Sequence, residues 1–270
     1  MIIDAHTHIG AMGKDDRNVT VADLLQSMDE AGIDMSLILA NDIAVSDDWR
    51  GMSADDILTQ CAGNDRIKVI GNITISRDIN DQLLRLREHV EAGVVVGIKL
   101  YPGYENFYPS DERLKPVYEF CQKFNIPVVL HTGFLLQGSP GIQEQAHPNS
   151  IDKIVNLFPE LIFIMAHFGN PWTAEAARVI AQHQNIYADL SGFFTEYDEH
   201  ISLEEKADFY QKMKEFISIT GNLKKCLFGT DWPLYSQKEY LAAVQELPMK
   251  DEERDLFFWK NSSRIFGLAA

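Results

Sequence analysis

Four histidines, one aspartate and one lysine stand at the ends of short apolar runs of this sequence. They are His6, His8, Lys99, His131, His167 and Asp231. Neutral imidazole and carboxylate are natural ligands for zinc and related divalent ions. His6 and His8 are two positions apart, which on a strand directs both side chains to the same face. Each residue alone could be an ordinary polar group at a strand end, but their joint occurrence favours one metal site.

The runs that carry these residues belong to a regular alternation of strands and helices. Eight β-rich runs cover residues 2–6, 34–40, 67–75, 94–101, 127–133, 161–169, 185–192 and 225–233. Amphipathic helical patterns cover residues 20–32, 111–125, 173–185, 203–221 and 251–268. Strands alternating with helices predict a parallel sheet, and eight such units predict a closed α/β TIM barrel, (β/α)8, as one domain over residues 1–270.

A doubly wound open sheet is the alternative architecture. That fold commonly places a glycine-rich turn after its first strand, whereas His-Thr-His stands there in this chain. In a barrel, the carboxyl ends of the strands surround one mouth, where active sites lie. Because side chains alternate along a strand, Val129 and His131 share a face, as do Phe163, Met165 and His167. We therefore expect the six chemically active side chains to converge at this mouth, with Lys99 either joining them or pairing with Asp231.

Composition and charge narrow the classes of molecule to which this protein is expected to bind. The formal net charge is -16 and no basic patch offsets it, which argues against nucleic acid and anionic membranes as partners. No apolar run approaches the roughly 20 residues needed to span a bilayer. The start has no secretory pattern, and none of the three cysteines lies in a C-x-x-C pair. We expect a cytoplasmic protein that acts on a small molecule.

The residues around the six side chains carry a family resemblance. The segments are IDAHTHIG, GIKLYP, AHPNSIDKIVNLFPELIFIMAHFG, NIYADLSG, LFGTDWP and NSSRIFGL. Together with the order His-x-His, Lys, His, His, Asp, they resemble the amidohydrolase superfamily. Within it, the chain resembles the amidohydrolase-related (amidohydrolase 2) family of metal-dependent TIM-barrel hydrolases, lactonases and nonoxidative decarboxylases. The resemblance runs from Ile2 to Leu268.

The resemblance implies roles for the six residues. His6, His8, His131 and Asp231 would hold the main divalent metal, expected to be Zn²⁺, with Mn²⁺ or Fe²⁺ as alternatives. His167 would bind a second ion or act as an acid and base. Lys99 would be carboxylated and bridge two ions in a binuclear site, or stay free and bind substrate in a mononuclear one.

The implied chemistry is hydrolysis. Water on such an ion has its pKa lowered toward about 7, Asp231 can accept its proton, and His167 and Lys99 can stabilise the oxyanion. We expect a C–O or C–N bond of a lactone, ester or amide to be cleaved. Loop residues then suggest a small substrate that bears a carboxylate. They are Arg17, Arg50, Tyr104, Trp172 and Trp232, although arginines and aromatic residues are also common in loops that bind nothing.

Two other functions remain open. The first is a metal-dependent nonoxidative decarboxylase of a small cyclic or unsaturated acid, although the chain is shorter than typical decarboxylases of the group. The second is a binding barrel that has lost catalysis, which would be expected to lack some of the six residues. The aromatic segment 257–260 could pair two chains into a homodimer, but we favour its packing onto the barrel.

Overall fold

The computed structural model describes residues 1–12, 17–46, 49–136, 138–194 and 201–268. For residues 12, 17, 44–46, 49 and 50 it describes the backbone only.

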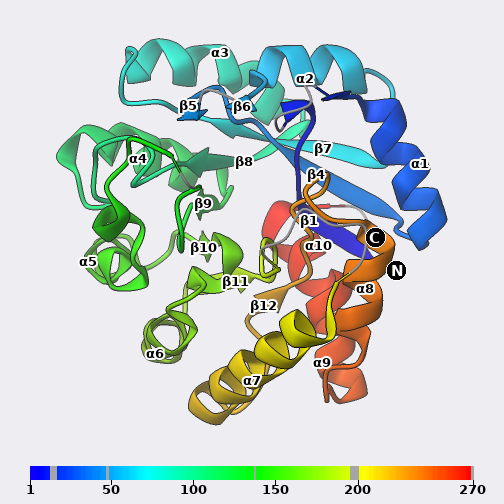
Figure 1. Ribbon diagram of the computed structural model, residues 1–270. Coiled ribbons are helices and arrows are strands. Elements are labelled where there is room, and N and C mark those ends of the chain that lie inside the picture. Colours follow the sequence, from blue (N-terminus) through cyan, green and yellow to red (C-terminus); the bar gives the residue numbers. More distant parts are fainter. Residues whose placement is uncertain (13–16, 47–48, 137, 195–200, 269–270) are drawn as a thin grey trace.

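Eight parallel strands form the centre of the molecule, as the sequence predicts (Figure 1). In sheet order they are β1 (Ile3–Thr7), β4 (Met35–Leu39), β7 (Ile67–Asn72), β8 (Val95–Leu100), β9 (Val128–Leu130), β10 (Phe163–Met165), β11 (Ile186–Asp189) and β12 (Cys226–Leu227). Main-chain contacts join the last strand to the first. Ala5 N–H donates to Phe228 O over 2.9 Å, and Thr7 pairs with Trp232 in an isolated parallel β-bridge. The prediction of a TIM barrel is confirmed.

Helices surround the barrel and connect its strands (Figure 1). They are α1 (Val21–Ala31), α2 (Ala54–Cys61), α3 (Ile79–Glu91), α4 (Lys115–Phe124), α5 (Asp152–Leu157), α6 (Thr173–Gln182), α7 (Leu203–Thr220) and α8 (Gln237–Gln245). The chain then continues through α9 (Asp251–Asp255), a π-helical turn at Leu256–Lys260 and α10 (Asn261–Phe266). The five helical patterns of the sequence are confirmed, whereas α2, α3, α5 and α8 were not singled out. Among the described residues, no helix combines the length and apolarity needed to cross a membrane.

Local signals explain where α1 begins and ends. The Thr20 side chain accepts a hydrogen bond from Asp23 N–H, and the Asp23 carboxylate accepts one from Thr20 N–H. This reciprocal capping satisfies donors that a helix start leaves open. Gly32 follows the helix with φ of 71°, a conformation that glycine adopts without steric strain.

Two apolar layers fill the fold. One small cluster joins strand residues such as Ala5, Leu37, Val129 and Ile164 to one another and to α10, so it occupies the barrel interior. A larger cluster joins strands to the outer helices, and it contains Phe163 and Met165. The expected inward direction of Phe163 and Met165 is therefore wrong. The chain leaves the extended conformation after Met165, so strict alternation does not carry on to His167.

A second, smaller sheet lies outside the barrel and was not predicted. Its antiparallel strands β2 (Gly10–Met12), β3 (Arg17–Val19), β5 (Ala44–Ser46) and β6 (Trp49–Arg50) have the order β3-β2-β6-β5. They come from the loops that follow β1 and β4. These loops thus have their own main-chain pairing beside the carboxyl ends of two barrel strands.

The aromatic segment at residues 257–260 packs inward. Phe257 and Phe258 are buried, and their rings lie 6.3 and 5.5 Å from that of Phe228 just after β12. The favoured interpretation of this segment is confirmed, and the homodimer stays a prediction.

Candidate metal centre

A cavity of about 180 Å³ opens at the carboxyl ends of the barrel strands. All six residues singled out from the sequence line it, namely His6, His8, Lys99, His131, His167 and Asp231. They come from β1, β8 and the segments that directly follow β1, β9, β10 and β12. The predicted convergence at the barrel mouth is therefore observed.

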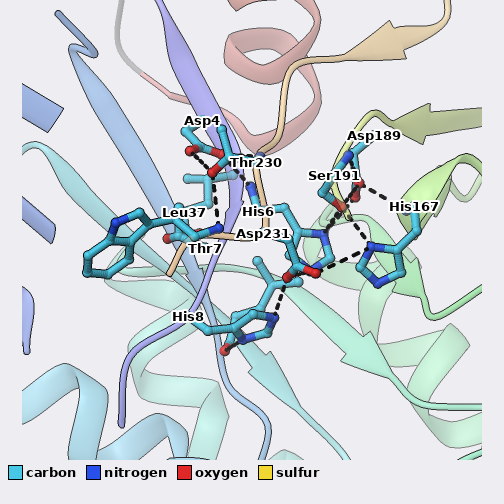
Figure 2. A network of polar contacts seen from close by, with 12 residues as sticks. Asp4, His6, Thr7, His8, Leu37, His167, Asp189, Ser191, Thr230 and Asp231 are labelled. Atoms are coloured by element: carbon cyan, nitrogen blue, oxygen red, sulfur yellow. Dashed lines mark hydrogen bonds and ion pairs between the residues drawn. The ribbon is translucent and has the colours of Figure 1, made fainter. Parts of the chain in front are cut away.

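Three of these residues form a compact donor group. One side-chain nitrogen or oxygen from each of His6, His8 and Asp231 lies within 4.8 Å of the others. Asp231 Oδ1 is 3.3 Å from His8 Nε2 and 3.6 Å from His6 Nε2. Figure 2 shows the Asp231 carboxylate between His8 and His167.

The opposite nitrogens of the two imidazoles fix their tautomers. His8 Nδ1 lies 2.9 Å from the carbonyl oxygen of Leu39, and His6 Nδ1 lies 3.0 Å from Asp189 Oδ2. Because these oxygens only accept, each Nδ1 carries a proton, and in the neutral form of each ring the lone pair of Nε2 points toward Asp231. Three acceptor atoms then face one another in a buried site, an arrangement that a cation stabilises.

His6 Nε2 supports the same conclusion. It is buried and has no hydrogen-bond partner among the described residues, whereas buried polar atoms normally have one. This orphaned nitrogen, together with the imidazole and carboxylate donor set, fits a divalent metal ion.

His131 lies beside this group rather than within it. Its ring centroid is 5.0 Å from that of His167, and its Nε2 faces the carbonyl oxygen of Phe134 at 3.2 Å. In the described part of the chain, the donor groups of three are His6, His8 and Asp231, and His6, His167 and Asp189. His131 belongs to neither, so its role as a ligand stays a prediction.

Lys99 reaches the cavity as a fully buried amine. Its Nζ has no hydrogen-bond partner among the described residues and lies 5.1 Å from the centroid of the Tyr101 ring. Burial lowers the pKa of Lys99 to about 8. The amine is thus a poorly solvated donor that a ligand in the cavity could satisfy.

Burial also sets the charge of the other groups. It lowers the pKa values of His6 and His131, and that of His167 to about 3. Burial alone would raise the pKa of Asp231, but the contact with His8 and the nearby His167 and His6 lower it below its ordinary value. Neutral imidazoles beside an ionised carboxylate are the protonation states that a divalent cation requires.

Asp189 and Ser191, which are not among the six predicted residues, support two of the histidines. Ser191 Oγ lies 3.0 Å from His6 Nδ1 and 3.0 Å from His167 Nδ1, and it donates to Asp189. Asp189 Oδ1 also accepts from the backbone N–H of His167 over 3.1 Å. Both residues stand at the end of the seventh apolar run, the same position that identified the other residues.

A second carboxylate, Asp4, ties β1 to the segment after β12. It accepts from Thr230 N–H at 3.0 Å, Thr230 Oγ1 at 2.6 Å and Gln237 Nε2 at 2.8 Å. Burial raises the pKa of Asp4 to about 7. The contacts hold the chain just before His6 against the chain just before Asp231, as Figure 2 shows for Asp4 and Thr230.

The backbone around the site is unusual. His167, Phe168 and Asp231 have φ values of 60°, 54° and 66°, a region that L-residues rarely occupy and that often marks functional sites. A Cβ on Gly192 would lie 2.7 Å from His167 Nδ1 and 3.0 Å from Asp231 Oδ2. Only glycine lets this loop approach both side chains so closely.

The residues predicted to bind substrate are placed differently. Tyr104 lines the cavity, and its ring lies 4.7 Å from that of His131. Trp172 packs between Phe134 and His147, and Trp232 is buried; neither is among the residues that line the cavity. The side chains of Arg17 and Arg50 lie outside the described residues.

The comparisons with known proteins identify the family. The amidohydrolase family model matches residues 3–268, and the chain belongs to this family. It is 25% identical over 122 residues to the FluG protein of Emericella nidulans, a match that covers 45% of this chain and 13% of that protein.

Three solved structures share the fold. An amidohydrolase of Burkholderia multivorans with bound zinc has 16% identity, covers 100% of both chains and has a TM-score of 0.74. A probable 2-pyrone-4,6-dicarboxylic acid hydrolase of Acinetobacter baumannii with bound citric acid has 18% identity and a TM-score of 0.71, covering 98% of this chain and 99% of that chain. A dihydroxybenzoic acid decarboxylase of Polaromonas with bound manganese and 2-nitroresorcinol has 16% identity and a TM-score of 0.71, covering 99% and 97%. At these identities the likeness establishes the fold.

Proposed function

We propose that this amidohydrolase is a metal-dependent hydrolase that cleaves a C–O or C–N bond of a small, carboxylate-bearing lactone, ester or amide. The observation that carries the proposal is the set of facing acceptor atoms on His6, His8 and Asp231. In this arrangement a cation would stabilise the site and serve the chemistry.

We propose His6, His8, His131 and Asp231 as the residues that hold the ion. Zinc is the proposed metal, because imidazole and carboxylate suit it and because the similar Burkholderia amidohydrolase has zinc bound. The similar Polaromonas decarboxylase has manganese, which keeps Mn²⁺ as an alternative beside Fe²⁺. When bound, such an ion lowers the pKa of water toward about 7 and polarises a carbonyl group.

The residues of the chain then divide the proton transfers and charge stabilisation. Asp231 directs Oδ1 toward His8 and places Oδ2 3.8 Å from His167 Nδ1. This second oxygen can accept a proton from water and deliver it to the leaving group. Lys99 Nζ can donate to the oxygen on which negative charge develops, and His167 can orient that oxygen.

Lys99 also decides the number of ions. A carboxylated Lys99 would add an anionic ligand and, with His167, allow a second ion, whereas a free amine would bind substrate. Anomalous diffraction from a crystal would distinguish two peaks bridged by a modified lysine from one peak beside a bare amine.

Metal analysis and product analysis test the proposal together. Purified protein should contain stoichiometric divalent metal by mass spectrometry. It should hydrolyse members of a panel of lactones, esters and amides that includes 2-pyrone-4,6-dicarboxylate, chosen from the similar Acinetobacter protein. Reaction in H₂¹⁸O should place the label in the product. Metal-loaded protein that hydrolyses no compound of the panel would contradict the proposal.

A nonoxidative decarboxylase is the second candidate. The residues that line the cavity include the apolar side chains of Phe134, Leu135 and Phe194, and such a lining suits an aromatic acid. Release of carbon dioxide from a dihydroxybenzoate without ¹⁸O incorporation would favour this reaction. A protein that takes up no divalent ion at all would instead favour an inactive binding barrel.

A further inference from the structure

Asn41 stands where β4 ends at the barrel mouth, and it lines the same cavity. Its side chain is almost fully buried, at 1% exposure. The residue is neutral, so it adds no charge to the donor groups described above. It follows β4, which pairs with β1, whereas Lys99 lies two strands further along the sheet on β8.

The orientation of the Asn41 amide is fixed by the backbone of Met52. Asn41 Oδ1 accepts a hydrogen bond from Met52 N–H at 2.9 Å. Exchanging the oxygen and nitrogen would set an N–H₂ group against an N–H donor, so the assignment of the two atoms is unambiguous. The Nδ2 group is therefore a donor.

The other polar groups of Asn41 are satisfied. Its N–H donates to Met52 O at 3.2 Å, and its C=O accepts from Ile43 N–H at 2.7 Å. Nδ2 alone is buried without a hydrogen-bond partner among the described residues. Such a donor destabilises a folded protein unless something pairs with it.

The backbone gives Asn41 little freedom to turn away. A Cβ on Gly51 would lie 1.8 Å from the carbonyl oxygen of Asn41, so the loop after β6 passes directly against this residue. Tyr101 Oη donates to the carbonyl oxygen of the preceding Ala40 at 2.9 Å, which fixes the end of β4 to the end of β8. The amide is held by its surroundings rather than free to find another partner.

From this geometry we infer that Asn41 is a substrate-binding residue whose Nδ2 donates a hydrogen bond to a carboxylate oxygen of the ligand in the cavity. The inference rests on the proposed function, because it takes the cavity as the substrate site. Lys99 Nζ is a second unpartnered buried donor of the same cavity. Two donors without internal acceptors match a ligand rich in acceptors, and a carboxylate is the strongest common one.

Benzoate binding measured by calorimetry tests this role in metal-loaded protein. Asn41→Asp keeps the oxygen that accepts from Met52 but removes the donor, and Asn41→Ala removes both. The charge control is Asn170→Asp, because Asn170 lines the same cavity but its amide is already paired with Phe193 O at 3.3 Å and Lys212 Nζ at 2.9 Å. We expect both Asn41 variants to weaken benzoate binding at least about tenfold, as expected for the loss of a hydrogen bond to a charged group, and Asn170→Asp to weaken it less than about threefold.

Several results would overturn the role of Asn41. The first two are wild-type protein that binds no benzoate and Asn41→Ala protein that binds benzoate as tightly as wild type. The others are equal losses of benzoate affinity in Asn41→Asp and Asn170→Asp, and failure of both Asn41 variants to fold. The assay separates this role from the proposed function. Absent turnover by wild-type protein would count against the hydrolase and leave the benzoate comparison intact, whereas unchanged benzoate affinity would count against Asn41 alone.

Discussion

The two walls of the cavity differ in how their polar groups are held. On the wall formed by β1, β10, β11 and β12, His6 and His8 each have an anchored Nδ1, and Asp189 and Ser191 support both His6 and His167. On the wall formed by β4 and β8, the side-chain nitrogens of Asn41 and Lys99 have no hydrogen-bond partner among the described residues. The first wall is organised before anything binds, whereas the second has donors that await a ligand. This difference suggests one wall for the ion and one for the substrate.

Asp231→Asn gives the largest expected effect, because it removes the negative charge from the anchored wall while keeping the shape of the side chain. Stoichiometric metal should be lost, and turnover should fall by about 10³-fold or more, since the proposed proton acceptor is removed as well. Metal content by mass spectrometry and product formation measure both. Full metal occupancy with unchanged turnover would contradict the division between the walls.

Gly192→Ala should disturb the anchored wall without changing a polar group. The new methyl group would meet His167 Nδ1 at 2.7 Å, so turnover should fall more than about tenfold. The positive φ should also lower the free energy of unfolding by about 1–2 kcal/mol, measured by urea denaturation.

Gly221→Ala is the matched control for this prediction. Gly221 has a φ of 78° but nothing within 4 Å of its added Cβ, so it should lose similar stability and keep full turnover. Equal turnover in the two variants would show that His167 tolerates displacement.

Asp189→Asn tests a residue that positions the proposed metal ligand His6 and is not itself proposed as a ligand. Its amide can no longer accept from His6 as an anion, so metal affinity should fall by about 10–100-fold. Competition with a chelator measures the affinity. Ser191→Ala should produce a smaller loss, because Asp189 still contacts His6; a larger loss than that of Asp189→Asn would reverse the proposed order of support.

Lys99→Met should have the opposite effect on stability from changes in the anchored wall. Removing a buried, unpartnered amine should raise the free energy of unfolding by about 1–3 kcal/mol at pH 7, while turnover is lost. Since the pKa of Lys99 is lowered from 10.5 to about 8, the unfolded chain binds more protons between these values. The free energy of unfolding of the wild-type protein therefore rises across that pH range relative to that of Lys99→Met. The difference between the two proteins should shrink accordingly. Urea denaturation at pH 7, 8, 9 and 10 measures this difference. A difference that stays constant with pH would show that the Lys99 amine does not cause it.

The sequence predicts the barrel and the meeting of six side chains, because both follow from short-range patterns. Strand and helix periods recur along the chain, and the six residues stand at the ends of five of the eight runs. The direction of Phe163 and Met165 could not be obtained from alternation, since His167 adopts a left-handed backbone conformation that no local pattern marks.

Other features depend on partners that are distant in sequence. Asp189 and His6 are 183 residues apart, and Asp4 and Thr230 are 226 apart. Asn41 can be identified as a donor only from the structure, where the N–H of Met52 fixes the orientation of its amide. The sequence thus indicates which residues can do chemistry, while the supporting contacts require the three-dimensional arrangement.

The small antiparallel sheet has a consequence for how the protein can change. Its strands β2, β3, β5 and β6 leave the barrel directly after His8 and Asn41, and they pair through main-chain atoms such as those of Ala11 and Arg50. The pairing of β2 with β6 therefore ties the loop after β1 to the loop after β4, so a shift of one loop is passed to the other without a change in any barrel strand.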